Sequence, residues 1–130
     1  MTSAGPNPGG QRFGRKLRLR SRAEFDRGMR GGVRVADQRL TLWALGNELE
    51  HARLGLVVGR RHGGAVGRSR LRRLLREAFR TERERLPAGL DLVCSPRPGE
   101  RLSLAGAVES LVALGWRARS RLVKGAARTG

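Results

Sequence analysis

The chain has 130 residues, enough for one domain and too few for two. Its formal net charge of +17 arises from 28 basic and 11 acidic residues, and such a charge opposes compaction unless a polyanion neutralises it. The lone cysteine, Cys94, excludes an intramolecular disulfide and a multi-cysteine zinc site. No segment has the apolar length of a signal-peptide core or a membrane span, so we expect a cytoplasmic protein. The high positive charge favours a nucleic acid as its partner.

The composition along the chain predicts three regions. Residues 1–16 are rich in Gly and Pro and then basic, which is typical of a disordered arm, and residues 117–130 form a basic C-terminal tail. The folded domain is expected over 17–116. Its first helix begins at Ser21, which forms a capping box with Glu24, and the glycines of "RGG" at 30–32 end it in the left-handed conformation.

Three strands and a last helix follow from the pattern. Residues 39–45 and 53–59 predict two strands that pair as a hairpin, and 90–94 predicts a third. In the first strand, alternation places Leu40 and Leu42 on one face and Arg39, Thr41 and Trp43 on the other. The last helix is expected from Ser103 as its N-cap to Gly115 as its end.

Between these strands lies "AVGRSRLRRLLREAFR", residues 65–80, which holds six arginines and a leucine stripe. At about 100° per residue, an arc of little more than a third of the helix circumference collects the apolar positions Leu71, Leu74, Leu75, Ala78 and Phe79. The opposite side collects Ser69, Arg72, Arg73, Arg76, Arg80 and Arg83. The stripe therefore predicts a helix that packs on the sheet and presents a cationic face.

The cationic face could be an ordinary solvated face, but such faces mix charges because opposite charges at i, i+4 are stabilising. Here Arg72, Arg76 and Arg80 are successive like-charge neighbours. Their guanidinium groups match phosphate oxygens in geometry, which favours nucleic acid. An anionic membrane is disfavoured, because the apolar stripe is too narrow to serve both a core and a bilayer.

The same stretch resembles the Arg-Asn-Arg signature of the bacterial ribonuclease P protein component, Ala-Val-x-Arg-Asn-Arg-x-Lys-Arg-x-x-Arg-Glu. Seven positions match it directly: Ala65, Val66, Arg68, Arg70, Arg73, Arg76 and Glu77. The resemblance extends over about residues 17–116, through "RLRSRAEFDRGMRGG", "GLVVGRRHGGAV" and "LPAGLDLVCSPRPG". The departures are Ser69 for the central Asn, Arg72 for Lys, Gly59 for Ser, Arg60 and Arg61 for paired lysines, Met29 for an aromatic residue, and Trp43 for Tyr.

The resemblance implies a two-layer α/β (α+β) sandwich with a small mixed sheet and a left-handed βαβ crossover, like the second domain of ribosomal protein S5. It also implies an RNA-binding subunit that assists a catalytic RNA in cleaving the 5′ leader from precursor tRNA. The RNA-binding residues carried over are Arg60, Arg61, Arg68, Ser69, Arg70, Arg72, Arg73, Arg76 and Arg80. The leader is expected in a cleft formed by Phe25, Met29, Arg39 and Trp43, although the aromatic residues could simply fill a small second core.

We expect no catalytic residue, metal or cofactor in the protein itself, since the resemblance assigns the chemistry to the RNA and its magnesium ions. His51 and His62 are interpreted as surface residues, Asp91 as a turn cap, and Cys94 as core. The partners expected are the RNA subunit and precursor tRNA, without a membrane or an obligate protein partner. The alternative is a structural RNA-binding protein of ribosomal type with no role in tRNA processing.

Overall fold

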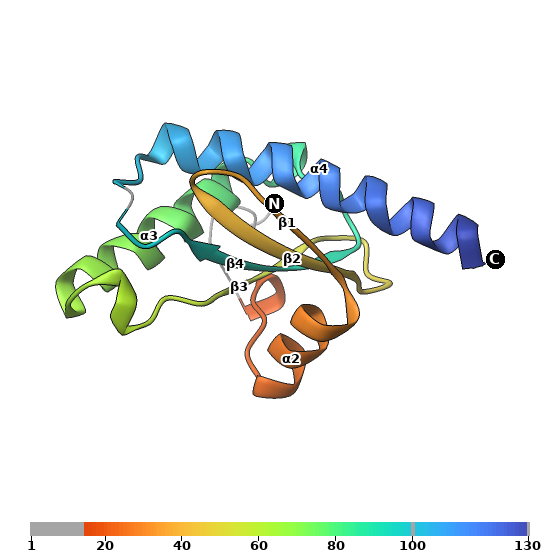
Figure 1. Cartoon of the computed structure of the whole chain (residues 1–130), viewed down its shortest axis with the longest axis horizontal. Coiled ribbons are helices and arrows are strands. Elements are labelled where there is room, and N and C mark those ends of the chain that lie inside the picture. The colour runs from red at the N-terminus through yellow and green to blue at the C-terminus, as the bar shows by residue number, and fades with distance from the viewer. Residues whose placement is uncertain (1–14, 100, 130) are drawn as a thin grey trace, which may run out of the picture.

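The computed structural model describes residues 15–99 and 101–129, and these residues form one mixed sheet flanked by helices (Figure 1). In chain order the helices are α2 (Arg22–Gly31), α3 (Ala65–Thr81) and α4 (Leu104–Thr129), and the strands are β1 (Val33–Ala36), β2 (Leu40–Gly46), β3 (Arg53–Leu56) and β4 (Leu90–Pro96). Three short 3₁₀ turns complete the set: η1 (Arg15–Leu17), η2 (Arg60–His62) and η3 (Arg83–Arg85).

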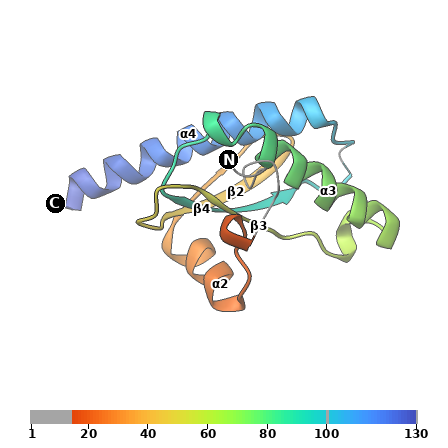
Figure 2. The ribbon, with the colours of Figure 1, turned by 180° about the vertical axis from the view of Figure 1, so that it is seen from behind.

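The sheet has the order β1-β2-β4-β3, and its two faces are covered differently. Helices α3 and α4 lie on one face and α2 lies on the other, as opposite views of the ribbon show (Figures 1 and 2). The main core lies under α3 and α4, where Leu42 and Leu92 of the sheet pack with Phe79 and Leu111 of the helices. The predicted α/β sandwich with a mixed sheet is confirmed.

The strand pairing differs from the predicted hairpin. β3 does not pair with β2; it runs parallel to β4, and β3, α3 and β4 form the βαβ unit of the fold. β2 instead lies between β1 and β4, antiparallel to both. β1 was not predicted, because its four residues, "VRVA", are too short to show an alternating pattern.

The first helix begins as predicted and ends for a different reason. The Ser21 hydroxyl accepts a bond from the Glu24 N–H at 3.1 Å, and the Glu24 carboxylate accepts one from the Ser21 N–H at 3.2 Å. Gly32, which follows the helix, is extended and not left-handed. Glycine is needed there because a Cβ atom would lie 1.9 Å from the carbonyl oxygen of Ala44 on the neighbouring strand.

The last helix is longer than predicted. α4 continues through Gly115 to Thr129, and Gly115 is a packing position where a Cβ atom would lie 3.3 Å from Pro87 Cδ. The predicted tail at 117–130 is therefore wrong as a separate region, since Ala118 is buried in the core and Leu122 packs against it. The arm predicted at 1–16 lies outside the described residues, apart from Arg15 and Lys16 in η1.

A buried ionic network ties α2 to the sheet. Asp91, interpreted above as a turn cap, is 2% exposed and accepts two bonds from Arg53, at 2.8 and 2.7 Å. Asn47 donates a third bond to the same carboxylate at 2.9 Å. Arg53 also reaches Glu24 of α2 at 3.1 Å, so one guanidinium joins β3, β4 and the first helix.

Candidate nucleic-acid interface

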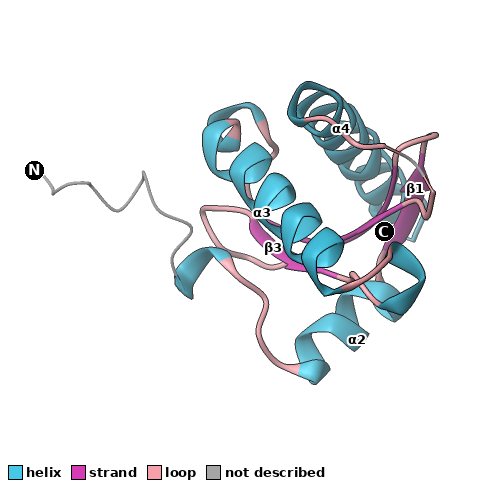
Figure 3. Ribbon diagram, turned by 90° about the vertical axis from the view of Figure 1, so that its left-hand side faces the viewer, coloured by secondary structure: helices cyan, strands magenta, loops and turns pink. Residues whose placement is uncertain are grey.

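Helix α3 has the two faces that the sequence predicts. Leu75, Ala78 and Phe79 are buried, and Leu71 and Leu74 pack against the same core at partial burial. Figure 3 shows that α3 lies beside α4, over the edge of the sheet formed by β3. The polar side of α3 consequently faces outward.

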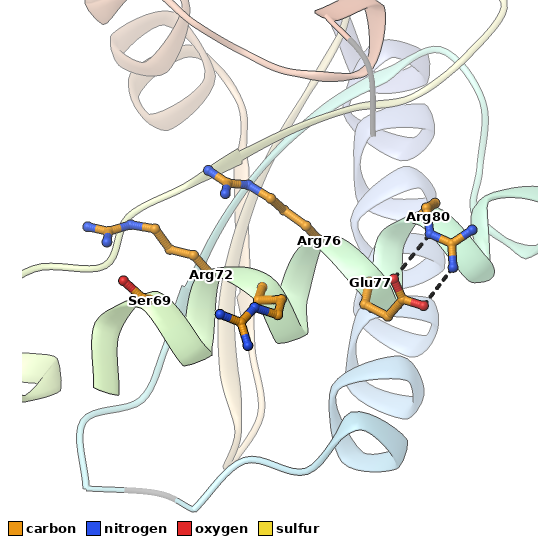
Figure 4. Close-up of a pocket in the computed structure, with 6 residues that line it drawn as sticks. Ser69, Arg72, Arg76, Glu77 and Arg80 are labelled. Atoms are coloured by element: carbon orange, nitrogen blue, oxygen red, sulfur yellow. Dashed lines mark hydrogen bonds and ion pairs between the residues drawn. The ribbon is translucent and has the colours of Figure 1, made fainter. Parts of the chain in front are cut away.

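That polar side carries an open hollow (Figure 4) lined by Ser69, Arg72, Arg73, Arg76, Glu77 and Arg80. Arg80 makes two hydrogen bonds to the Glu77 carboxylate, at 3.1 and 2.6 Å, and this pairing lowers the pKa of Glu77 and raises the pKa of Arg80. The only acidic group lining the hollow is therefore already occupied by Arg80. Ser69 and Arg73 are exposed at its surface.

Arg72 and Arg76 project together, away from the Glu77–Arg80 pair (Figure 4). Burial lowers the pKa of Arg76, and the positive charges of Arg18 and Arg72 lower it further. The positive charges of Arg18 and Arg72, from two parts of the chain, thus repel the guanidinium group of Arg76. Such repulsion is relieved when an anion binds, as a phosphate group would.

Two of the predicted RNA-binding arginines are held by the protein backbone. Arg72 donates to the Val58 carbonyl at 3.0 Å, and Arg70 donates to the Leu102 carbonyl at 3.3 Å. A guanidinium has five N–H donors, so each side chain is fixed while keeping donors for a ligand. Arg68 is half-buried, and its Nε is a buried donor with no hydrogen-bond partner among the described residues.

The loop before α3 adds two more cations. Arg60 and Arg61 are exposed in η2, and His62 fixes that turn. The His62 Nδ1 accepts a bond from the Gly59 N–H at 3.0 Å, so its Nε2 carries the proton and donates to the Pro96 carbonyl at 2.7 Å. His62 therefore anchors the loop to the end of β4, and its interpretation as a surface residue is wrong.

The N-terminus of α3 is also suited to an anion. Gly64 is its N-cap without a side-chain hydrogen bond, and no acidic residue lies in the first turn. The positive end of the helix dipole is therefore left uncompensated beside Arg70 and Arg73, which line a second hollow there.

A basic segment before α2 was missed as part of the site. Lys16, Arg18 and Arg20 line a hollow together with His51 and Arg53, and the His51 Nε2 lies 3.0 Å from the Lys16 carbonyl oxygen. His51 is half-buried in this contact and is not a simple surface residue. The alternation in "KLRLR" is the signal that could have found the segment, since Leu17 and Leu19 are buried and the intervening cations point outward.

The aromatic residues lie on the α2 face of the sheet. Phe25 packs so closely on β3 that a Cβ atom at Gly55 would lie 2.7 Å from its ring. Trp43 is half-buried on β2, between Arg34 of β1 and Val93 of β4 in the strand register. Met29, on α2, is half-buried. These three residues belong to the side of the sheet that faces α2.

Arg39 does not join them, so its predicted place beside Trp43 is wrong. It precedes β2 in the turn after β1, where strand alternation does not set the direction of the side chain. Its guanidinium reaches Ser110 at 3.2 Å and Glu109 at 3.4 Å, both on α4, which covers the opposite face.

Cys94 is core, as predicted: it is fully buried in the sheet, and burial raises the pKa of its thiol to about 12. Within 15–99 and 101–129, no three His, Cys, Asp or Glu side chains are grouped so that they could hold a metal ion. No helix in this part of the chain is both long and apolar enough to span a membrane.

These features define a class: a small α/β protein whose cationic helix and flanking arginines suit a phosphodiester backbone. A family model described as Ribonuclease P matches residues 13–118, which include every element from η1 to the buried half of α4. The chain belongs to this family of ribonuclease P proteins.

Relatives and solved structures agree over most of the chain. A ribonuclease P protein component from Syntrophobacter fumaroxidans is 40% identical over 108 residues, covering 82% of this chain and 91% of that relative. The ribonuclease P protein from Thermotoga maritima has a TM-score of 0.70 at 32% identity, over 77% of this chain and 96% of the other. That from Staphylococcus aureus has a TM-score of 0.65 at 28% identity, over 73% and 88%.

Proposed function

We infer that this chain is the protein subunit of ribonuclease P and takes part in the 5′ processing of tRNA as part of a ribonucleoprotein. The observation that carries this inference is the family match over residues 13–118, which includes the whole arginine face of α3. The ribosomal-type alternative gains no support, since the relatives and solved structures named above are ribonuclease P proteins.

We propose that the polar face of α3 binds the RNA subunit, mainly through phosphates. Support comes from the grouping of Arg18, Arg72 and Arg76: burial, and after it the charges of Arg18 and Arg72, lower the pKa of Arg76. The backbone bonds of Arg70 and Arg72 hold these groups in place before the RNA arrives. Preorganised guanidinium groups lose less side-chain freedom on binding, which favours affinity.

The cleavage itself we assign to the RNA subunit and the magnesium ions it requires. In support, several ionisable groups among the described residues already serve the fold or its surface ion pairs. Asp91 is taken by Arg53, Glu77 by Arg80 and His62 by the η2 loop, and the pKa of Cys94 keeps its thiol protonated near neutral pH. The proposal places the protein in the cytoplasm with its precursor tRNA.

For the leader of the precursor tRNA we propose the α2 face, with Trp43 stacking on an unpaired base and Phe25 and Met29 beside it. Stacking of a base on an aromatic ring contributes about 1–3 kcal/mol, so one ring is enough for a measurable effect. The partial exposure of Trp43 supports this role, whereas Phe25 is held against Gly55 and also serves as packing.

The test is reconstitution with the ribonuclease P RNA of the same organism. Wild-type protein should lower the magnesium requirement for precursor-tRNA cleavage, and a protein that leaves cleavage unchanged would overturn the proposed function. Arg73→Ala should lower the log–log salt dependence of RNA-subunit binding by somewhat under one unit. Arg27→Ala removes the same charge from the exposed side of α2 and should leave that slope unchanged.

The leader is tested separately with Trp43→Ala. This variant should weaken holoenzyme binding to leader-bearing precursor tRNA and leave binding of mature tRNA nearly unchanged. Because both ligands use the same holoenzyme, equal losses would show that Trp43 supports the fold and does not contact the leader.

A further inference from the structure

The C-terminal part of α4 lies beyond the domain that defines the family. The family match ends at residue 118, whereas α4 continues to Thr129. Residues 117–130 contain five cations, Arg117, Arg119, Arg121, Lys124 and Arg128, and no acidic residue. This concentration of charge is not explained by the arginine face of α3, which belongs to another helix.

Among the cations whose side chains the structure describes, three share one side of α4. At about 100° per residue, Arg117, Arg121 and Lys124 fall within an arc of about 60°. Arg117 donates to the Ala36 carbonyl at 3.3 Å and Arg121 donates to the Arg34 carbonyl at 3.0 Å, so this side follows the free edge of β1. All three side chains are exposed. We call these three residues the α4 stripe.

Two purely structural roles, stabilising the helix end and bonding the β1 edge, explain only partly why the α4 stripe carries three cations. Cations stabilise the C-terminal end of a helix, but this effect falls off within the last turn, and Arg117 and Arg121 lie two turns or more before Thr129. Bonding an edge carbonyl uses one donor of a guanidinium that has five. Arg121 is repelled by Arg117 at i, i−4 and by Lys124 at i, i+3, which a purely structural role would not require.

The edge of β1 connects the stripe to the α2 face. Arg34 is the register partner of Trp43, so the side chains of these two residues lie on the same face of the sheet. Arg34 is exposed, and its carbonyl is the group that Arg121 binds. A route therefore leads from Trp43 to the cation Arg34 and around the sheet edge to the α4 stripe.

We propose that the α4 stripe binds the phosphates of the leader where it continues past Trp43. The proposal rests on the proposed function and extends the leader site from Arg117, at the end of the family match, to Arg121 and Lys124 beyond it. An aromatic ring followed by cations that track the backbone is the arrangement that binds single-stranded RNA without sequence preference. A longer leader is thereby held more tightly, at a place remote from the α3 hollow.

The experiment compares precursor tRNAs with leaders of about 5 and about 15 nucleotides, lengths within the range that single-strand-binding domains track. Holoenzyme affinity is measured against salt concentration for wild type and for Arg117→Gln/Arg121→Gln/Lys124→Gln. The matched control is Arg22→Gln/Arg27→Gln/Arg30→Gln, which removes three exposed cations from α2. Lys124→Gln alone is the second variant, because Lys124 forms no hydrogen bond with the described residues and its loss spares the bonds to β1.

With the long leader, the triple variant should lower the salt slope by about 2 units and the single variant by about 0.7, since each single-strand phosphate contact contributes about 0.7. With the short leader, both should equal wild type, and the α2 control should show no dependence on leader length. Equal losses for both leaders, no loss for either, or weakened binding to the RNA subunit alone would each overturn the proposal. A wild-type holoenzyme that fails to cleave the short-leader substrate would instead count against the proposed function.

Discussion

Replacing Asp91 by alanine should be among the most damaging single changes in the sheet. The carboxylate accepts two bonds from Arg53 and one from Asn47, and it is 2% exposed. Its loss leaves the Arg53 guanidinium, whose side chain is 17% exposed, with Glu24 as its remaining carboxylate at 3.1 Å. Removing one partner of a buried ion pair costs about 3–5 kcal/mol, because the other charge stays buried.

The loss should be visible in urea unfolding followed by circular dichroism at neutral pH. A domain of this size has about 5–15 kcal/mol of stability, so Asp91→Ala should move the midpoint strongly toward lower urea. The double variant Arg53→Met/Asp91→Leu replaces both charges by apolar groups, and it should recover most of the loss. A cost below about 1 kcal/mol for Asp91→Ala, or a double variant as unstable as the sum of its single changes, would refute this reasoning.

Three further outcomes are expected. Leu75→Ala should lower the free energy of unfolding by about 2–5 kcal/mol, because Leu75 is 1% exposed. Leu74→Ala should lower it clearly less, because Leu74 is only half-buried, and equal losses would contradict the packing described. Ser69→Asn should leave thermal stability unchanged because Ser69 is exposed, and a marked loss would show a packed position. The N–H groups of Arg20 and Ser21, together with Arg53, lower the pKa of Glu24 from its usual value of 4.5. The ionised Glu24 therefore stabilises the folded protein above pH 4.5, and this contribution is lost as the pH falls through the lowered pKa of the folded state. Unfolding free energies between about pH 6 and pH 3 should therefore fall less steeply in Glu24→Gln than in wild type.

Features set by local chemistry could be predicted from the sequence. The capping box needs only Ser21 and Glu24 three residues apart, and the apolar stripe of α3 needs only the helical repeat. Phe25, Trp43 and the α3 arginines could be carried over from the family resemblance because they lie in regular elements, where residue position fixes the face.

Features set by distant contacts could not be predicted. β3 is close to β2 in sequence but pairs with β4, across the whole of α3, and no local pattern carries that choice. Gly115 resembles a helix end, yet it is a close contact with Pro87, which only the packed structure shows. Arg39 lies in a turn, so the alternation of the strand does not set the direction of its side chain. The buried partner of Asp91 is Arg53, which lies 38 positions earlier in the chain.

The central position of β4 has a consequence for synthesis of the chain. Residues 90–96 are the last of the four strands to be translated, yet they lie between β2 and β3 and are the only described link between those strands in the sheet. The earlier strands and α3 therefore leave the ribosome without all of the surface they pack on, and the apolar stripe of α3 stays open until β4 and α4 arrive. The nascent chain thus presents its six-arginine segment, close to ribosomal RNA, before it can fold.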